Sequence, residues 1–249
     1  MKVKKSDTKK VFLKKGTCSR TFFYILNREF GNLKEEEERA SDPLAGGLAQ
    51  EGYQCGMLWG AALAVGAESF RRYENHGEAI AHAISATQSI LESFINRAKS
   101  ANCGVITNCD FNGKFGLAKF LITGKPLICF NLADKWAPEA IQSANRGLSQ
   151  QPTDLPELPI SCASEVVKKM GGSNEEMVMV AGFAGGIGLS GNACGALGAA
   201  VWMKSRAWFK ENPNSDNFYN PYAKAALKAF YKETNSEILC SKICGRNFK

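Results

Sequence analysis

The stretch GGLAQEGYQCGML at residues 46–58 recurs as GGIGLSGNACGAL at residues 185–197. Both copies have the form Gly-Gly-x4-Gly-x2-Cys-Gly-x-Leu, which places Cys55 and Cys194 at equivalent positions. A repeated segment of this kind indicates a repeated structural unit that packs against its own copy. The recurrence therefore predicts a chain built from two copies of one module.

The other cysteines align around this anchor. Cys18 matches Cys162, and the segment CGVITNCDF (103–111) matches CSKICGRNF (240–248), with the last cysteine displaced by two positions. The displacement means that the two sites need not be identical. The alignment predicts two sets of candidate metal ligands, namely Cys18, Cys55, Cys103 and Cys109 in the first half, and Cys162, Cys194, Cys240 and Cys244 in the second. The ninth cysteine, Cys129, lies in the apolar stretch PLICFNL and is predicted to be a buried small hydrophobe.

Hydrophobic periodicity predicts helices in both halves. Apolar residues recur at spacings of three and four over 80–95, and residues 223–231 repeat the pattern behind Asn220-Pro221, a predicted N-cap and first-turn pair. Short helices are also expected after Cys18 and Cys162. Strand-like alternation is rare, so the predicted fold class is all-α, with two tandem homologous helical modules packed as a pseudo-twofold pair.

Composition changes along the chain predict four segments. These are a basic flexible tail (1–15), the first cysteine module (16–113), an extension with a proline-rich linker (114–160) and the second cysteine module (161–249). The extension has no counterpart in the second half. It contains an apolar stretch and a predicted helix from Pro138 to Asn145.

Bulk composition narrows the class of protein. A chain of 249 residues with 45% hydrophobic content is long and apolar enough to bury a core. Nine cysteines and no visible secretory signal indicate a cytoplasmic protein whose thiols bind a metal or carry out redox chemistry. Much of the net charge of +7 lies in the basic tail, which is interpreted as a solvated segment, so no nucleic-acid partner is expected.

The second half also contains two patterns that are typical of other classes of protein. Residues 177–203 carry no charge, but seven glycines lower their hydropathy, so a buried central helix in each half is preferred to a membrane span. Residues 186–191 form a G-x-G-x-x-G, yet the first half does not keep its glycines and no second strand ending in an acid follows. Dinucleotide binding is therefore not favoured.

Glycines flank the repeated cysteine in both halves. Each Cys-Gly opens an alanine-rich run, which predicts Cys55 and Cys194 at helix N-termini, where free amides and the helix dipole stabilise a thiolate. Helix packing alone would explain the small residues but not the recurring cysteine. Neighbouring glycines let backbone N–H groups approach sulfur, so they are predicted to line a cofactor site: Gly52, Gly56, Gly191 and Gly195.

The residues alone leave the chemistry of these thiols open. Four thiolates could hold a [2Fe-2S] or [4Fe-4S] cluster or a structural zinc ion, or could form two disulfides. The spacings Cys-x5-Cys and Cys-x3-Cys do not discriminate among them. No Cys-x2-Cys-His occurs, which argues against a c-type haem.

At these residues the chain resembles the C_GCAxxG_C_C family of redox-active proteins, helical modules with a lone cysteine, a Gly-Cys-Ala-x-x-Gly motif and two later cysteines. In the second half, Cys194 and Gly198 keep the family spacing, although the residues on either side of the cysteine are alanine and glycine in the reverse order. In the first half, Gly60 follows Cys55 one position later than the glycine of the family motif. The similarity of this family to the iron–sulfur part of split-Soret cytochromes implies an iron–sulfur cluster and electron transfer to a redox partner protein. Thiol–disulfide or sulfur-handling chemistry ranks second, and a structural metal-binding module third; a homodimer stays open.

Overall fold

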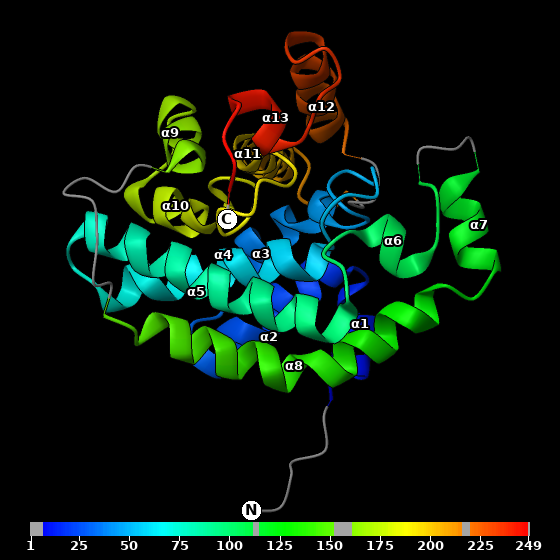
Figure 1. The fold of residues 1–249 in the computed structure, drawn as a ribbon, viewed down its shortest axis with the longest axis horizontal. Helices are drawn as coiled ribbons and strands as arrows, with labels where there is room; N and C mark the ends of the chain where they lie inside the picture. Colours follow the sequence, from blue (N-terminus) through cyan, green and yellow to red (C-terminus); the bar gives the residue numbers. More distant parts are fainter. Residues whose placement is uncertain (1–6, 112–114, 152–160, 216–219, 249) are drawn as a thin grey trace, which may run out of the picture.

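The computed structural model describes residues 7–111, 115–151, 161–215 and 220–248. Over these ranges the chain forms thirteen α-helices and two short 3-10 helices, with two isolated β-bridges and no strand (Figure 1). The predicted all-α class is confirmed.

The same six helical elements occur in the same order in both halves. The first half contains α2 (Cys18–Phe30), α3 (Glu35–Ala40), η1 (Asp42–Leu44), α4 (Gly56–Arg72), α5 (His76–Ala98) and α6 (Cys103–Thr107). The second half contains α9 (Cys162–Lys169), α10 (Asn174–Met179), η2 (Ala181–Phe183), α11 (Gly195–Glu211), α12 (Pro221–Glu233) and α13 (Cys240–Cys244). Three helices have no counterpart, namely α1 (Thr8–Lys15), α7 (Gly116–Ile122) and α8 (Pro126–Leu148).

A glycine loop joins the 3-10 helix to the repeated cysteine in each half. Gly47 has φ +82°, and a Cβ added there would lie 2.4 Å from the backbone nitrogen of Tyr53. Gly186, at the matching position, has φ +81° and would place a Cβ 2.6 Å from the backbone nitrogen of Asn192. A left-handed φ and a close backbone approach both require glycine, which explains why the repeated sequence begins with these residues.

Several helices begin at the predicted signals. The Oδ1 atom of Asn220 accepts a hydrogen bond from the backbone N–H of Ala223 (2.9 Å), as expected of an N-cap. Cys55 and Cys194 are the N-cap residues of α4 and α11, and neither sulfur bonds to its own helix as a cap. Both thiols therefore lie at helix N-termini, as predicted.

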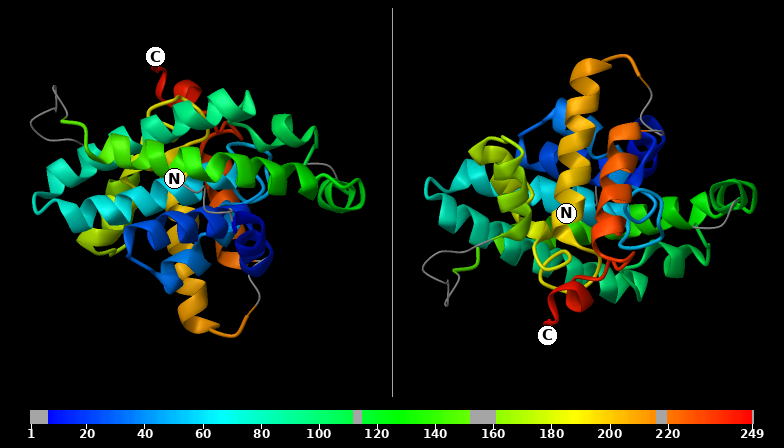
Figure 2. Two further views of the ribbon diagram at one scale, coloured as in Figure 1. Left: turned by 90° about the horizontal axis from the view of Figure 1, so that it is seen from below. Right: turned by 90° about the horizontal axis from the view of Figure 1, so that it is seen from above.

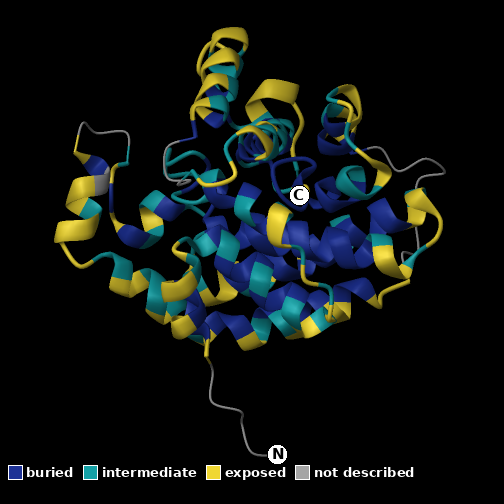
Figure 3. Cartoon of the chain, turned by 180° about the vertical axis from the view of Figure 1, so that it is seen from behind, coloured by how far each residue is buried: buried dark blue, intermediate teal, exposed yellow. Residues whose placement is uncertain are grey.

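The core is centred on α4, which is buried from Gly56 to Ser69 (Figure 3). Helices α2 and α5 pack on it from the first half and α10 packs on it from the second (Figure 1). One hydrophobic cluster contains fully buried tryptophans of both halves, including Trp59 and Trp202. Since burying a large apolar side chain stabilises a fold by about 1.5–3 kcal/mol, the halves stabilise each other through this shared core.

Equivalent positions of the two halves meet in this core. Trp59 and Gly198 are matched in the repeat, and a Cβ added at Gly198 would lie 2.3 Å from a ring carbon of Trp59. Gln54 and Ala193 are also matched, and the Gln54 Oε1 atom accepts from the Ala193 N–H at 3.1 Å. Residues meet their own equivalents where a twofold axis passes between two copies. These contacts favour the pseudo-twofold arrangement, which stays a prediction.

The N-terminal segment differs from the predicted flexible tail. Residues 8–15 form α1, which packs on α2 and α8 through buried Val11 and Phe12. The Phe12 ring lies 4.5 Å from the Phe130 ring of α8. The apolar stretch is short, but α8 supplies a complementary apolar surface that the local sequence does not reveal. Residues 1–6 lie outside the described residues.

The extension also differs from prediction, because its helix is much longer. Helix α8 runs from Pro126 to Leu148 and contains Pro138, which was expected to begin the helix. It lies along α5 (Figure 2) and buries Trp136, whose Nε1 donates to the Ser93 Oγ at 3.2 Å. The tertiary contact with α5 extends the helix on both sides of the predicted segment. Residues 152–160 of the predicted linker lie outside the described residues.

Within the described ranges, no helix combines the length and the apolar character that crossing a membrane requires. Residues 177–203 are instead divided among α10, η2, the glycine loop and the first part of α11. The G-x-G-x-x-G at 186–191 follows a 3-10 helix rather than a strand, so it lacks the context of a dinucleotide-binding loop.

Candidate functional site

Backbone hydrogen bonds bring the second and third cysteine of the first half together. The N–H of Cys55 donates to the Ala101 carbonyl (2.8 Å), and the N–H of Cys103 donates to the Tyr53 carbonyl (2.6 Å). These bonds surround an antiparallel bridge between Gln54 and Asn102. The starts of α4 and α6 are thereby fixed side by side.

The second half contains the same arrangement. The N–H of Cys194 donates to the Ile238 carbonyl (2.8 Å), and the N–H of Cys240 donates to the Asn192 carbonyl (2.6 Å). The bridge here joins Ala193 and Leu239. The sequence repeat thus extends to individual hydrogen bonds around the thiols.

The predicted glycines position these cysteines. The carbonyl of Gly52 accepts from the N–H of Gly104 (2.9 Å), and the carbonyl of Gly191 accepts from the N–H of Ser241 (3.0 Å). Both bonds hold the helix that begins with the third cysteine. That these glycines line a cofactor site stays a prediction.

Gly56 makes room for the first cysteine of its set. A Cβ added at Gly56 would lie 2.6 Å from the Cys18 Sγ and 2.9 Å from the Ala45 Cα. Gly195 occupies the matching position, where a Cβ would lie 1.7 Å from the Phe183 carbonyl oxygen. The residue after the repeated cysteine must therefore be glycine in both halves of this chain.

Cys18 and Cys55 form a hydrogen-bonded pair of thiols. The Cys55 thiol lowers the pKa of Cys18, and backbone N–H groups that include that of Gly46 act in the same direction against burial. The same hydrogen bond raises the pKa of Cys55, which burial raises further. The first half therefore holds a thiolate-stabilising position at Cys18 beside a protonated thiol at Cys55.

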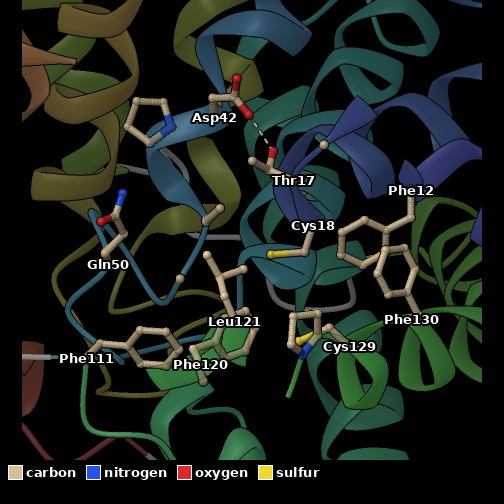
Figure 4. A pocket seen from close by; sticks show the side chains of 16 residues that line it. Phe12, Thr17, Cys18, Asp42, Gln50, Phe111, Phe120, Leu121, Cys129 and Phe130 are labelled. Carbon is tan, nitrogen blue, oxygen red and sulfur yellow. Dashed lines mark hydrogen bonds between the residues drawn. The ribbon is translucent and has the colours of Figure 1, made fainter. Parts of the chain in front are cut away.

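Cys129, predicted to be a buried small hydrophobe, packs against the hydrophobic core and also lies near this group. It is half-buried on the first turns of α8 and lines a cavity with Cys18 and Cys103 (Figure 4). Burial raises the pKa of Cys129 to about 12, and nearby Cys18 contributes. Burial also raises the pKa of Cys103, with further contributions from Cys18, Cys129 and Cys109.

Cys109 is the last cysteine of the predicted first set, and it is buried. Its thiol donates to the Gly116 carbonyl at 3.4 Å, at the start of α7. Cys109 interacts with Cys103, whereas Cys129 interacts with Cys18, Cys55 and Cys103. Cys109, as predicted from the sequence, and Cys129 are therefore both candidates for the fourth member of this set.

The four thiols of the predicted second set lie near one another, and their role as ligands stays a prediction. Burial raises the pKa of Cys194, the N–H groups of Leu197 and Ala196 oppose this, and nearby Cys162 and Cys244 raise it again. Burial raises the pKa of Cys240 to about 12, with contributions from Cys244, Cys194 and Cys162. Cys162 and Cys244 are exposed, so this set is open to solvent while Cys55, Cys103 and Cys109 of the first half are buried.

All nine thiols are free in the structure. Among the described residues, no three His, Cys, Asp or Glu side chains are arranged to hold a single metal ion. The thiols of each set interact without converging on one point. Four cysteine thiolates are the usual donor set of an iron–sulfur cluster, so the residues of each set fit such a group by their chemistry.

A cavity of about 330 Å³ opens beside the first set (Figure 4). Its walls come from α1, the segment 42–50, α7 and the start of α8. Because α1, α7 and α8 have no counterpart in the second half, this enclosure belongs to the first half of the repeat.

The fold and the site define an all-α protein in which two repeated helical units each gather cysteine thiols, three of them at helix N-termini. A family model described as "Putative redox-active protein (C_GCAxxG_C_C)" matches residues 17–136 and 160–249. The chain belongs to this family, as its sequence predicted, and it is a redox-active protein of the family. No curated protein and no solved structure matches the chain.

The thiols of the first half are expected to differ in their reactivity with pH. In metal-free, reduced protein, Cys18 should react with iodoacetamide at lower pH than Cys103, because the thiolate is the nucleophile and the Cys18 pKa is lowered while the Cys103 pKa is raised. Peptide mass spectrometry over a pH series measures both sites in one sample. Equal pH profiles for the two cysteines would contradict the environments described.

Proposed function

We propose that the protein transfers electrons through an iron–sulfur cluster held by each set of cysteines. The observation that carries the proposal is the pairing of helix starts that holds Cys55 beside Cys103 and Cys194 beside Cys240, with the other thiols of each set nearby. In the first half the ligands would be Cys18, Cys55, Cys103 and Cys129, and in the second half Cys162, Cys194, Cys240 and Cys244. When bound, a cluster supplies a site that gains and loses single electrons.

Residues of the chain would tune such a centre. The backbone N–H groups of Ala196 and Leu197 lower the pKa of the Cys194 thiol, because N–H groups near a sulfur stabilise negative charge on it. The buried first set lacks the solvent exposure of Cys162 and Cys244. Burial disfavours the more negative, reduced form of a centre, so the two sets are expected to have different reduction potentials.

The first measurement is an anaerobic purification followed by a visible spectrum and by iron and acid-labile sulfide analysis of the same sample. Cys194→Ser should remove the iron of the second half, which is about half of the total when both sets are filled. Unchanged iron and an unchanged spectrum in this variant would refute the assignment.

Two matched serine substitutions identify the fourth ligand of the first half. Cys129→Ser should reduce the iron of that half, because Cys129 interacts with Cys18, Cys55 and Cys103. Cys109→Ser should leave iron unchanged, because the Cys109 thiol is directed to the Gly116 carbonyl. The opposite pattern would restore the ligand set that the sequence predicted.

Thiol–disulfide exchange is a second candidate, favoured by the hydrogen-bonded pair Cys18 and Cys55. The Cys18 thiolate would attack a disulfide of a partner protein and release one partner thiolate, which takes up a proton. Cys55, once deprotonated, would then attack the Cys18 sulfur, forming the Cys18–Cys55 disulfide and releasing the second partner thiol. The partner disulfide is reduced by the two electrons that the pair loses. A colourless, iron-free protein that loses two thiols on oxidation would support this candidate over a cluster.

A further inference from the structure

The cavity beside the first cysteine set has two aromatic walls. Phe12 and Phe130 form one ring pair with centroids 4.5 Å apart, and Phe111 and Phe120 form another at 5.4 Å. Figure 4 shows the two pairs on opposite sides, with the Cys18 sulfur between them. The cavity therefore offers flat apolar surfaces directly beside a redox-active thiol.

The polar groups of the cavity disfavour an anion. Apart from its thiols, Asp42 is the one ionisable side chain among the described residues that line it. The Asp42 carboxylate accepts hydrogen bonds from the hydroxyl of Thr17 and from Arg20, which anchors it at the rim. Because a carboxylate and no basic side chain stand among the described lining residues, the cavity disfavours a negatively charged molecule.

The volume sets the size of an occupant. An apolar cavity of roughly 150 Å³ stays dry and binds benzene, and this one measures about 330 Å³. Binding pockets for small molecules start at about 300 Å³ and are lined mainly by apolar and aromatic side chains. A molecule with two fused rings matches both the volume and the walls.

We propose that this cavity binds an uncharged organic molecule of about two fused rings, placed between the two phenylalanine pairs and against the Cys18 sulfur. Cys18, Cys103 and Cys129, which the proposed function makes cluster ligands, also line this cavity, so the molecule binds against the thiols and the iron content of each sample is measured beside its binding. The proposed site belongs to the first half alone. The second cysteine set has no counterparts of α1, α7 and α8 to enclose a small molecule.

A pair of probes that differ in charge tests the site. Equilibrium dialysis of the full chain, purified anaerobically, would compare neutral 1-naphthalenemethanol with anionic 1-naphthoate. We expect saturable binding of one neutral molecule per chain, with a dissociation constant at least about tenfold below that of the anion. No saturable binding of the neutral probe, or equal binding of both probes, would overturn the proposal.

Two adjacent substitutions on α7 locate the bound molecule. Leu121 lines the cavity and is 59% exposed, whereas the next residue, Ile122, is 85% exposed and does not line it. Leu121→Asp should weaken binding of 1-naphthalenemethanol at least about tenfold, because it places a carboxylate beside the apolar ligand. Ile122→Asp should leave binding unchanged, and both variants should keep the helical circular dichroism of the parent.

Equal weakening by the two variants would assign binding to the exposed surface of α7 and overturn the cavity site. An unchanged affinity in Leu121→Asp would overturn it as well. Iron analysis of the same samples separates this test from that of the cluster, because loss of iron without loss of probe binding refutes only the proposed function.

Discussion

Trp59→Gly is expected to lower the free energy of unfolding by about 3–5 kcal/mol, the usual effect of emptying a large buried aromatic site. The Trp59 side chain is fully buried, contacts Gly198, and lies edge-on to the Phe183 ring with centroids 4.7 Å apart. Its Nε1 donates to the Gln54 carbonyl at 3.1 Å, and that carbonyl would lose its partner. Urea unfolding followed by circular dichroism measures the change.

Exchanging the residues at positions 59 and 198 tests whether the two halves are related by a pseudo-twofold axis. Gly198→Trp alone should destabilise severely, since even a Cβ at Gly198 meets the Trp59 ring at 2.3 Å. The double variant Trp59→Gly/Gly198→Trp should recover part of the stability, because a pseudo-twofold axis would carry the indole into the space that Trp59 leaves. A double variant no more stable than the sum of the single changes would contradict that symmetry.

Gly195→Ala is the second change with a large expected effect. The family motif has alanine after the cysteine, yet a Cβ here would lie 1.7 Å from the Phe183 carbonyl oxygen and 2.4 Å from its carbonyl carbon. Neither contact involves a flexible side-chain end, so α11 or η2 must move. We expect a loss of about 2–3 kcal/mol, together with displacement of the adjacent Cys194.

Ala196→Gly is the matched control, because it removes a Cβ at the next position of the same helical turn. It should cost no more than about 1 kcal/mol through lost helix propensity. Unfolding midpoints measure stability, and alkylation of Cys194 in metal-free protein reports the local disturbance. If Gly195→Ala proved as stable as the parent, the packing of α11 against η2 would be other than described.

The repeated cysteine segment predicted much of this architecture because its information is local. Glycines with left-handed backbone, such as Gly47, and the N-cap positions of Cys55 and Cys194 depend on residues close by in the chain. The second cysteine set was likewise predictable, because each member has a counterpart in the first half. Duplication supplied an internal comparison that a single module lacks.

The features that were missed depend on contacts distant in sequence. Cys129 has no counterpart in the second half and meets Cys18 only because α8 begins at Pro126 and crosses the first module. Proline at a first helical turn was a usable signal for that start. Helix α1 is stabilised by packing of Phe12 on Phe130, which no pattern within residues 8–15 reveals.

The indole of Trp59 against the bare backbone of Gly198 has a consequence for how such proteins arise. If the first half paired with an identical copy in this geometry, two indoles would compete for one space, and a self-paired second half would leave that space empty. Because the two halves are joined in one chain, the two sides of this contact can differ, and Trp59 and Gly198 fill one space between them. Expressed as separate polypeptides, the two halves would associate with each other in preference to copies of themselves.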